Sequence, residues 1–335
     1  MGTRARGWLG AVLAVLATSG PLGAQTNWVP RVQWENDGFN FWVHPAHRPD
    51  EEYTNGLRLT LDAASAPWWG ARFGRHRPGC DEGRAGPCLT TTVTVSHDMF
   101  TPNLDRLPYT VPSWEQERPF FSVLAVRGAG HVVTARSRRT TELLLGVTGP
   151  PAGGEILHLT SHRINRRFAR AVSGWDTQIG FEPAVGVAWR YSMLALRLGG
   201  RRHALLDVIP TVGASLGNVR TAAELGGLVR VGLNLTHPWD PRLWAGRRPI
   251  EVWVTAGGKL EYVARDMSLD GNLFSPNRHV ERVPGVEQYE FGLGARLGSL
   301  TLGYRAVTRS REYRTGPANH TWSSLSLGMS VVPSP

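Results

Sequence analysis

Two short stretches of the chain combine residue types that could carry out chemistry. They are Trp34-Glu35-Asn36-Asp37 and Tyr53-Thr54-Asn55-Gly56-Leu57, separated by residues 38–52. Together they place an amide, a carboxylate and a hydroxyl at the facing ends of two expected strands. Oxygen ligands that converge in this way suit a hard cation such as calcium. A hydrogen-bond network that closes the hairpin accounts for the same residues, so both interpretations stay open.

The alternation along these strands predicts where the side chains point. On the first strand Glu35 and Asp37 share one face, and on the second strand Thr54 shares a face with Arg58 and Thr60. We therefore expect Asp37 and Thr54 both to point inward, near the rim of a sheet.

A candidate helix carries a second set of reactive groups. Glu155 to Ala171 contains no Gly or Pro, and its acidic first turn and later basic residues are typical of a helix. His158 and His162 lie four residues apart, a spacing that can bind zinc, but Leu159 stands where a zinc protease helix carries its glutamate. A single histidine that activates water as a general base is the better functional interpretation. A solvated helix histidine is the alternative.

The N-terminus predicts export. Arg4 and Arg6 precede an apolar run that ends in small residues near Ala24, so residues 1–24 are expected to be a cleaved secretory signal peptide. Residues 25–335 then form one domain. No later segment offers the roughly 20 continuous apolar residues that a membrane-spanning helix needs.

Two further features constrain the compartment and the partners. Cys80 and Cys88 are the only cysteines, and in an oxidising compartment we expect them to form a local disulfide. The formal net charge of +10 favours anionic partners such as phosphate-bearing lipid, and nucleic acid is not expected for an exported chain. An arginine-favouring genome would explain the same excess of positive charge.

Alternation of polar and apolar residues recurs along the whole chain and predicts strands. Leu57, Leu59 and Leu61, for example, alternate with polar neighbours. About twelve such segments occur, at roughly 28–37, 53–63, 89–98, 119–130, 139–148, 177–195, 204–217, 220–236, 249–264, 287–298, 299–309 and 321–332.

An even number of antiparallel strands after a signal peptide predicts an all-β fold, a twelve-stranded antiparallel transmembrane β-barrel of the bacterial outer membrane. The short helix would lie in an extracellular loop, and the cysteine loop on the periplasmic side. A secreted β-sandwich is the alternative. Aromatic residues near strand ends would suit interfacial girdles, namely Trp28, Trp34, Trp68, Trp69, Trp239, Trp244 and Trp322.

In this order, the motifs resemble those of the outer-membrane lipid A 3-O-deacylase (LpxR) family. The matching stretches span nearly the whole mature chain: Glu35-Asn36-Asp37, Tyr53-Thr54-Asn55-Gly56, Asp98-Met99-Phe100-Thr101-Pro102, Glu117-Arg118-Pro119-Phe120, Gly146-Val147-Thr148-Gly149-Pro150, residues 155–162, Gly174-Trp175-Asp176-Thr177-Gln178, Glu182-Pro183 and residues 311–316. No single stretch is diagnostic, but the ordered set is fairly specific.

The resemblance implies a calcium-dependent esterase that removes the 3-O-linked acyloxyacyl group of lipid A in the outer leaflet. His162 would activate water, and Asn36, Asp37 and Thr54 would organise calcium and the oxyanion site, with Asp37 as the metal ligand. The chain departs from the family pattern at His158, usually Gln, and at Phe168, where a glutamate is expected. A non-catalytic barrel of the same fold and a barrel phospholipase with another lipid substrate are the alternatives. A monomer is the working expectation.

Overall fold

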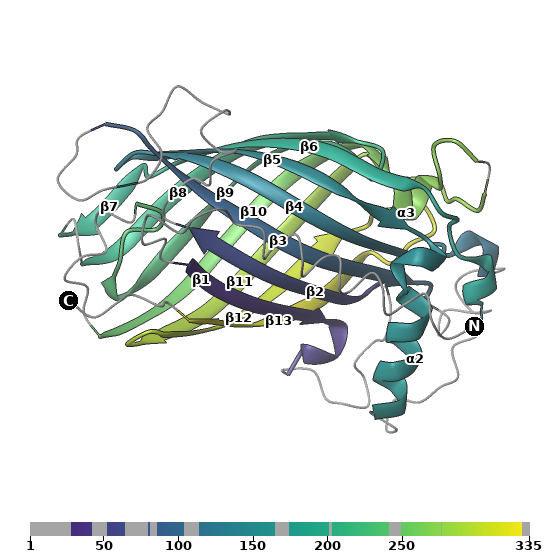
Figure 1. Cartoon of the computed structure of the whole chain (residues 1–335), viewed down its shortest axis with the longest axis horizontal. Coiled ribbons are helices and arrows are strands. Elements are labelled where there is room, and N and C mark those ends of the chain that lie inside the picture. The colour runs from purple at the N-terminus through teal and green to yellow at the C-terminus, as the bar shows by residue number, and fades with distance from the viewer. Residues whose placement is uncertain are drawn as a thin grey trace, which may run out of the picture.

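The computed structural model of the chain is a closed β-barrel with short helices at one end (Figure 1). It describes residues 28–41, 52–63, 80, 86–103, 114–164, 174–200, 203–240, 249–275 and 277–329, without the side chains of Trp28 and residues 161–164. The expected signal peptide, residues 1–24, lies outside the described residues.

The described strands follow the chain order around the barrel. They are β1 (Trp28–Asn36), β2 (Glu52–Ala63), β3 (Cys88–Thr101), β4 (Phe121–Val133), β5 (Ser137–Thr148), β6 (Pro183–Met193), β7 (Leu196–Gly199), β8 (Ala204–Gly217), β9 (Arg220–Leu235), β10 (Ile250–Asp266), β11 (Gly285–Leu297), β12 (Leu300–Ser310) and β13 (Asn319–Met329).

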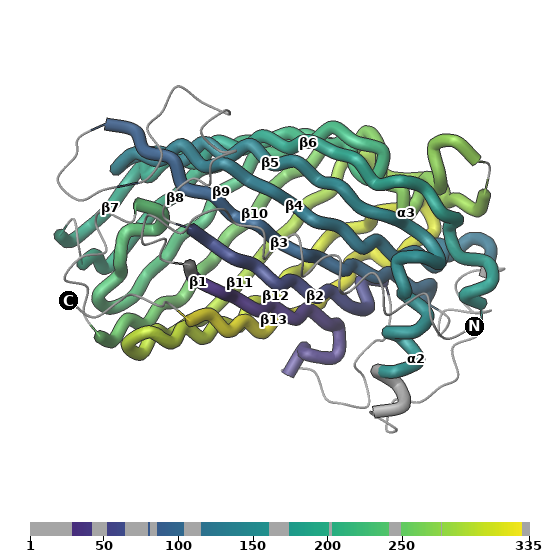
Figure 2. The backbone as a smooth tube through the Cα atoms, in the orientation of Figure 1, coloured from purple at the N-terminus to yellow at the C-terminus, as the bar shows by residue number. Residues whose placement is uncertain are grey.

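Antiparallel pairing closes the sheet. The first strand, β1, pairs with β13 as well as β2, and β6 pairs with β8 as well as β5. Because the short β7 continues the line of β6 along the same neighbour, β8, the two share one position in the wall. The barrel therefore has twelve strand positions, which confirms the predicted fold class. Figure 2 shows the strands running obliquely around the barrel.

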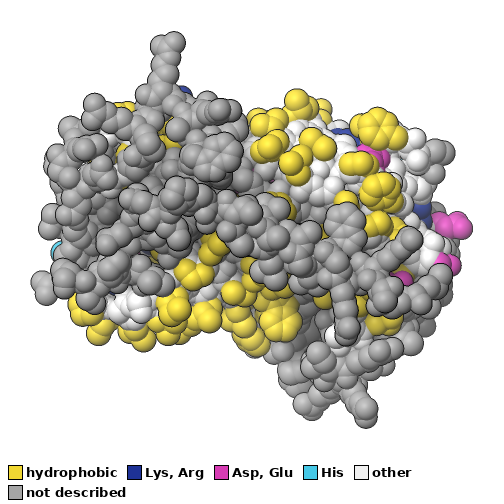
Figure 3. Space-filling view, viewed as in Figure 1, with side chains coloured by type: hydrophobic (Ala, Val, Ile, Leu, Met, Phe, Trp, Pro, Cys, Tyr) yellow, Lys and Arg dark blue, Asp and Glu magenta, His cyan; other side chains and the backbone are white. Residues whose placement is uncertain are grey.

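The residue alternation accounts for the two faces of the wall. Leu57 and Leu59 are 36% and 48% exposed on the outer face, whereas the intervening Arg58 points inward to Glu35 and Asp98. Hydrophobic side chains gather on the visible outer surface in Figure 3. An apolar exterior around a polar interior is typical of a barrel in a membrane. No helix in the described part of the chain is long and apolar enough to cross a membrane.

Short helices gather at one end, which we call the α2 end. The helix α2 (Gly154–Ile164) confirms the predicted helix over its first turns, and residues 165–173 lie outside the described part. The four-residue α3 (Met267–Asp270) was not predicted; Asp266 caps it by accepting a hydrogen bond from the Ser268 backbone N–H at 3.1 Å.

The predicted strand 177–195 begins too early, because Trp175–Thr177 forms a 3-10 turn, η8, and the ladder starts only at Pro183. The loop predicted to be extracellular, which contains the short helix, joins β5 and β6 at the α2 end. Which end faces outside the cell stays a prediction.

The opposite end of the barrel has its own small core. Cys80 and Cys88 form the predicted disulfide. Cys88 packs there with Val133, Leu194, Ile209 and Trp239.

Two tryptophans proposed for the interfacial girdles are buried instead, and the side chains of Trp28, Trp68, Trp69 and Trp244 lie outside the described part of the structure. Trp239 is 6% exposed in the cluster beside the disulfide, and Trp322 is 8% exposed against Tyr53. Trp34, at 47% exposure, does face outward. An aromatic residue at a strand end can point to either face, and position along the strand alone does not decide which.

Candidate functional site

The rims of β1, β2 and β3 bring two of the predicted site residues together at the α2 end. The Asn36 side-chain amide donates to the Thr54 carbonyl at 2.6 Å. The Thr54 hydroxyl is buried and lies 2.6 Å from the Thr101 hydroxyl on β3. One polar side chain from each of three adjacent strands thus forms a continuous set at the rim.

Asp37 follows directly in a 3-10 turn, η1 (Asp37–Phe39), whose N-cap is Asn36. The Gly38 backbone N–H donates to Asn36 Oδ1 at 2.7 Å and to Asp37 Oδ1 at 2.8 Å. The turn is tied to β13, because Asn40 donates to the Thr321 carbonyl and accepts from the Ser323 hydroxyl. These bonds hold the Asp37 carboxylate, which is only 3% exposed, beside the rim.

A β-bulge overturns the expected orientation of Thr54. The register between β2 and β3 shifts between Tyr53 and Asn55, so Thr54 is the extra residue. Tyr53, and not Thr54, joins Arg58 on the inner face, where it lines the central cavity. Simple alternation likewise does not extend to Asp37, because the chain leaves the strand for η1 at that residue.

At the same end of the barrel, α2 carries both candidate histidines. His158 is 2% exposed, and its Nδ1 accepts a hydrogen bond from Trp175 Nε1 at 3.1 Å. Trp175 in turn packs on Phe120 and Met99, which belong to the barrel wall and its edge. The interpretation of His158 as a solvated histidine is therefore wrong. His162 lies one turn further along α2, and its side chain is outside the described part.

The inner face behind the rim holds a second polar layer. The Tyr53 hydroxyl lies 2.6 Å from Glu35 Oε2 and 2.7 Å from Asp98 Oδ1, and it can donate to either. Arg58 forms ion pairs with both carboxylates. These groups line a cavity of about 590 Å³ inside the barrel.

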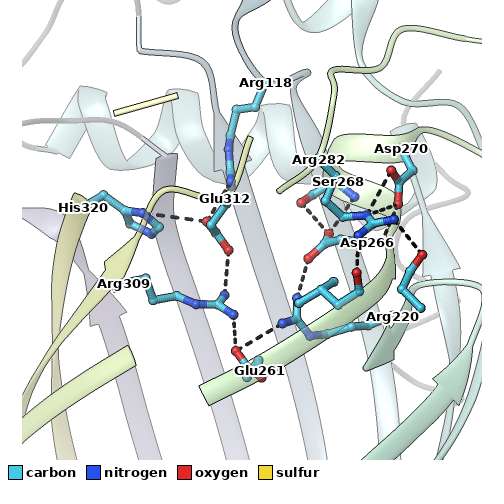
Figure 4. Close-up of polar contacts among 12 residues, drawn as sticks. Arg118, Arg220, Glu261, Asp266, Ser268, Asp270, Arg282, Arg309, Glu312 and His320 are labelled. Carbon is cyan, nitrogen blue, oxygen red and sulfur yellow. Dashed lines mark hydrogen bonds and ion pairs between the residues drawn. The ribbon is translucent and has the colours of Figure 1, made fainter. Parts of the chain in front are cut away.

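A chain of ion pairs crosses the α2 end of the barrel interior. Glu52 pairs with Arg118 at 2.6 Å, Arg118 with Glu312 at 2.9 Å, and Glu312 with Arg309 at 2.8 Å. Figure 4 shows how this chain continues through Glu261 and Arg220 to Asp266. It connects β2 to β12 and β10, so the mouth is cross-linked rather than open.

Ion pairing keeps Arg118 and Glu312 charged although both are buried. Burial alone would lower the pKa of Arg118, but the Glu52 and Glu312 carboxylates outweigh burial and raise it above its ordinary value. Burial alone would raise the pKa of Glu312, but Arg309 and Arg118 hold it well below its usual range. Each group is stabilised in its charged form by the other.

The donor set at the rim suits a hard cation only in part. Asp37, Asn36 and Thr54 offer oxygen donors, the type that calcium prefers. Within the described ranges, no group of three or more His, Cys, Asp or Glu side chains is placed to hold a metal ion. The rim therefore supplies one carboxylate and neutral oxygens, and a calcium site there needs further oxygen ligands.

Another pattern in the chain resembles a serine hydrolase motif but has the wrong context. Gly213-Ala214-Ser215-Leu216-Gly217 has the Gly-x-Ser-x-Gly spacing. A nucleophile elbow needs a sharp turn between a strand and a helix, whereas these residues all lie within β8. Ser215 is therefore not a candidate nucleophile.

Sequence reasoning missed three residues that the fold adds to the site. The Thr101 hydroxyl contacts the Thr54 hydroxyl, Trp175 donates a hydrogen bond to His158, and the Tyr53 hydroxyl contacts the carboxylates of the inner layer. Each belongs to a motif stretch noted above, but only the pairing of the strands assigns its contact. Phe168, the departure from the family pattern, lies outside the described residues.

Comparison with known proteins yields a family and a fold. A family model described as outer membrane protein LpxR matches residues 9–331. Among solved structures, LpxR from Salmonella typhimurium has a TM-score of 0.69 at 18% identity, and the match covers 90% of this chain and 99% of that chain. The β domain of the Bordetella autotransporter Brka has a TM-score of 0.44 at 13% identity, with 91% and 99% covered. No curated protein matches the sequence.

Proposed function

The chain belongs to the LpxR family of outer-membrane proteins, and on this premise we propose that it is an outer-membrane esterase that deacylates lipid A. The bond cleaved would be the ester that carries the 3-O-linked acyloxyacyl group. One observation carries the proposal: Asn36, Thr54 and Thr101 form a hydrogen-bonded rim at the same end of the barrel as the helix that contains His162.

Each residue has a distinct role in the proposed reaction. His162 takes a proton from water as the water attacks the ester carbonyl, and returns it to the departing sugar hydroxyl. Asn36 and Thr54 orient the ester at the rim. Asp37 would hold calcium, and when bound, calcium would stabilise negative charge on the carbonyl oxygen.

The setting of the site supports lipid A as the substrate. The rim lies at one end of a barrel with an apolar exterior, so a lipid in the surrounding leaflet reaches it by lateral diffusion. The formal charge of +10 favours an anionic lipid, and lipid A carries phosphate groups. Lipopolysaccharide in the outer leaflet meets both requirements.

The test is mass spectrometry of lipid A from cells whose outer membrane lacks other deacylases. Wild-type protein should produce a mass loss equal to the 3-O-linked acyloxyacyl group, and His162→Ala should lower the rate by about 10²–10⁴-fold. His203→Ala, which alters a histidine between β7 and β8 at the opposite end, is the matched control and should retain activity.

The same assay with purified protein separates the alternatives. Chelation of calcium should abolish product formation, and calcium alone should restore it. If a folded barrel cleaves only glycerophospholipid in the presence of calcium, then glycerophospholipid, and not lipid A, is the substrate. A folded barrel that cleaves neither lipid would contradict the proposal and favour a non-catalytic member of the family.

A further inference from the structure

We propose that Tyr53, on the inner face of the barrel, is a positioning residue for the candidate site on the rim. This inference rests on the proposed function, since it concerns the placement of Asn36 and Thr54. Tyr53 itself does not touch the substrate.

The strands β1, β2 and β3 each contribute one side chain to an inner layer and one to the rim layer. In the inner layer Tyr53 of β2 lies within hydrogen-bond distance of Glu35 on β1 and Asp98 on β3. In the rim layer Thr54 of β2 contacts Asn36 on β1 and Thr101 on β3. Asn36 follows Glu35 and Thr54 follows Tyr53 in the chain, so fixing the inner layer also fixes the backbone that carries the rim layer.

The bulge in β2 depends on this arrangement. Tyr53 pairs with Phe100 in register, Asn55 pairs with Met99, and Thr54 is left over. A bulge re-aims one side chain at the cost of a disrupted ladder, so it needs specific contacts to hold it in place. The Tyr53 hydroxyl supplies them on the inner face.

Gly56, three positions after Tyr53, shows how closely the tyrosine side chain packs against the backbone of β2. A Cβ added at Gly56 would lie 1.9 Å from the Tyr53 hydroxyl oxygen, so only glycine leaves room for it. On the other face, Asn55 Oδ1 accepts a hydrogen bond from Trp34 Nε1 at 2.6 Å. The motif Tyr53-Thr54-Asn55-Gly56 is thereby explained residue by residue.

The residue before Tyr53 is held from inside as well. Glu52 has a φ of +64°, a conformation that residues other than glycine adopt at a cost. Its carboxylate is fixed by Arg118 at 2.6 Å and by the Tyr313 hydroxyl at 2.7 Å. Both residues that precede Thr54 are therefore anchored in the barrel interior.

Loss of the Tyr53 hydroxyl should slow catalysis by displacing the side chains on the rim. A displacement of reacting groups by about 1 Å costs on the order of 10²-fold in rate. Without the Tyr53 hydroxyl the bulge can relax toward regular pairing, which moves the Thr54 hydroxyl off Thr101. The loss should fall on kcat, because orientation suffers while the lipid-binding surface is unchanged.

Tyr53→Phe tests the inference, because the ring can keep its packing on Phe100 and Trp322 while the hydroxyl is lost. We expect kcat to fall by roughly 10–100-fold, with KM unchanged within about two-fold. Tyr289→Phe is the matched control, since that hydroxyl bonds to Glu287 on the exposed surface of β11, and it should behave as wild type.

Hydrogen exchange provides a readout that is independent of activity. In Tyr53→Phe, amides of residues 36–40 and 54–56 should exchange faster, while those of β9 and β10 should not change. Unchanged exchange at the rim would overturn the inference, and so would a uniform increase over all strands, which would mark a general structural role. If the wild type hydrolyses no lipid, the proposed function fails, yet the exchange pattern still decides whether Tyr53 positions the rim.

Asp98→Asn is a second variant with a different expectation. It keeps an oxygen acceptor for the Tyr53 hydroxyl, so rim exchange should stay closer to wild type than in Tyr53→Phe. Equal disruption by both variants would show that the charge of the inner layer, and not the tyrosine hydroxyl, holds the rim.

Discussion

Replacing Arg118 with methionine should destabilise the barrel far more than the loss of an ordinary ion pair. The guanidinium is 0% exposed and lies between two carboxylates, with Glu52 at 2.6 Å and Glu312 at 2.9 Å. It also stacks over the Phe100 and Tyr313 rings. Removing one partner of a fully buried pair costs about 3–5 kcal/mol, because the remaining charge stays buried without compensation.

The two carboxylates do not contribute equally to that loss. Glu312 keeps Arg309 at 2.8 Å, whereas Glu52 keeps the Tyr313 hydroxyl as its hydrogen-bond donor. Most of the cost should therefore come from Glu52, and Glu52→Gln in the Arg118→Met background should restore part of the stability. The double variant is thus expected to be more stable than Arg118→Met alone.

The assay is urea unfolding of the barrel in lipid vesicles, followed by tryptophan fluorescence. Arg31→Met is the control, because the Arg31–Asp62 pair has side chains 47% and 37% exposed and should contribute less than about 1 kcal/mol. If Arg118→Met also costs less than about 1 kcal/mol, or if Glu52→Gln restores nothing, the assigned role of this network is wrong.

Three further changes test other parts of the structure. Burial lowers the pKa of His237 from 6.5 to about 4, with a further contribution from Arg197. Between these two pH values the unfolded chain takes up a proton that the folded chain does not, so the free energy of unfolding should fall by up to roughly 3 kcal/mol as the pH drops from 6.5 to 4. Denaturation series at several pH values measure this slope, and His237→Asn should flatten it. Replacing both Cys80 and Cys88 by serine should cost about 2 kcal/mol, as expected for a short closed loop, while hydrogen exchange at the α2 end stays unchanged. Trp175→Phe removes the hydrogen bond to His158, so proteolysis within α2 should become faster, and an unchanged cleavage rate would contradict the assigned contact.

The wall of the barrel is the part that local sequence predicts well. The segment predicted at 204–217 matches β8 residue for residue, and most other strands agree within two or three residues. The reason is that each strand has lipid on one side and a polar interior on the other, so its two faces differ along its whole length. Alternation fails where the wall ends, as at Trp175–Thr177, because a 3-10 turn replaces the ladder there.

The candidate site was only partly visible in the sequence. The sequence by itself determined that Asn36, Asp37 and Thr54 lie at the ends of adjacent strands, because strand spacing and connection order are local properties. Only the tertiary structure decided that Tyr53 faces inward and that Thr54 meets Thr101, because a bulge is placed by contacts across three strands. Likewise, the hydrogen bond between Arg118 and Glu312 joins residues 194 positions apart in the chain. Such contacts depend on closure of the barrel, which brings distant side chains together inside it, and residue alternation carries no information about which of them will meet.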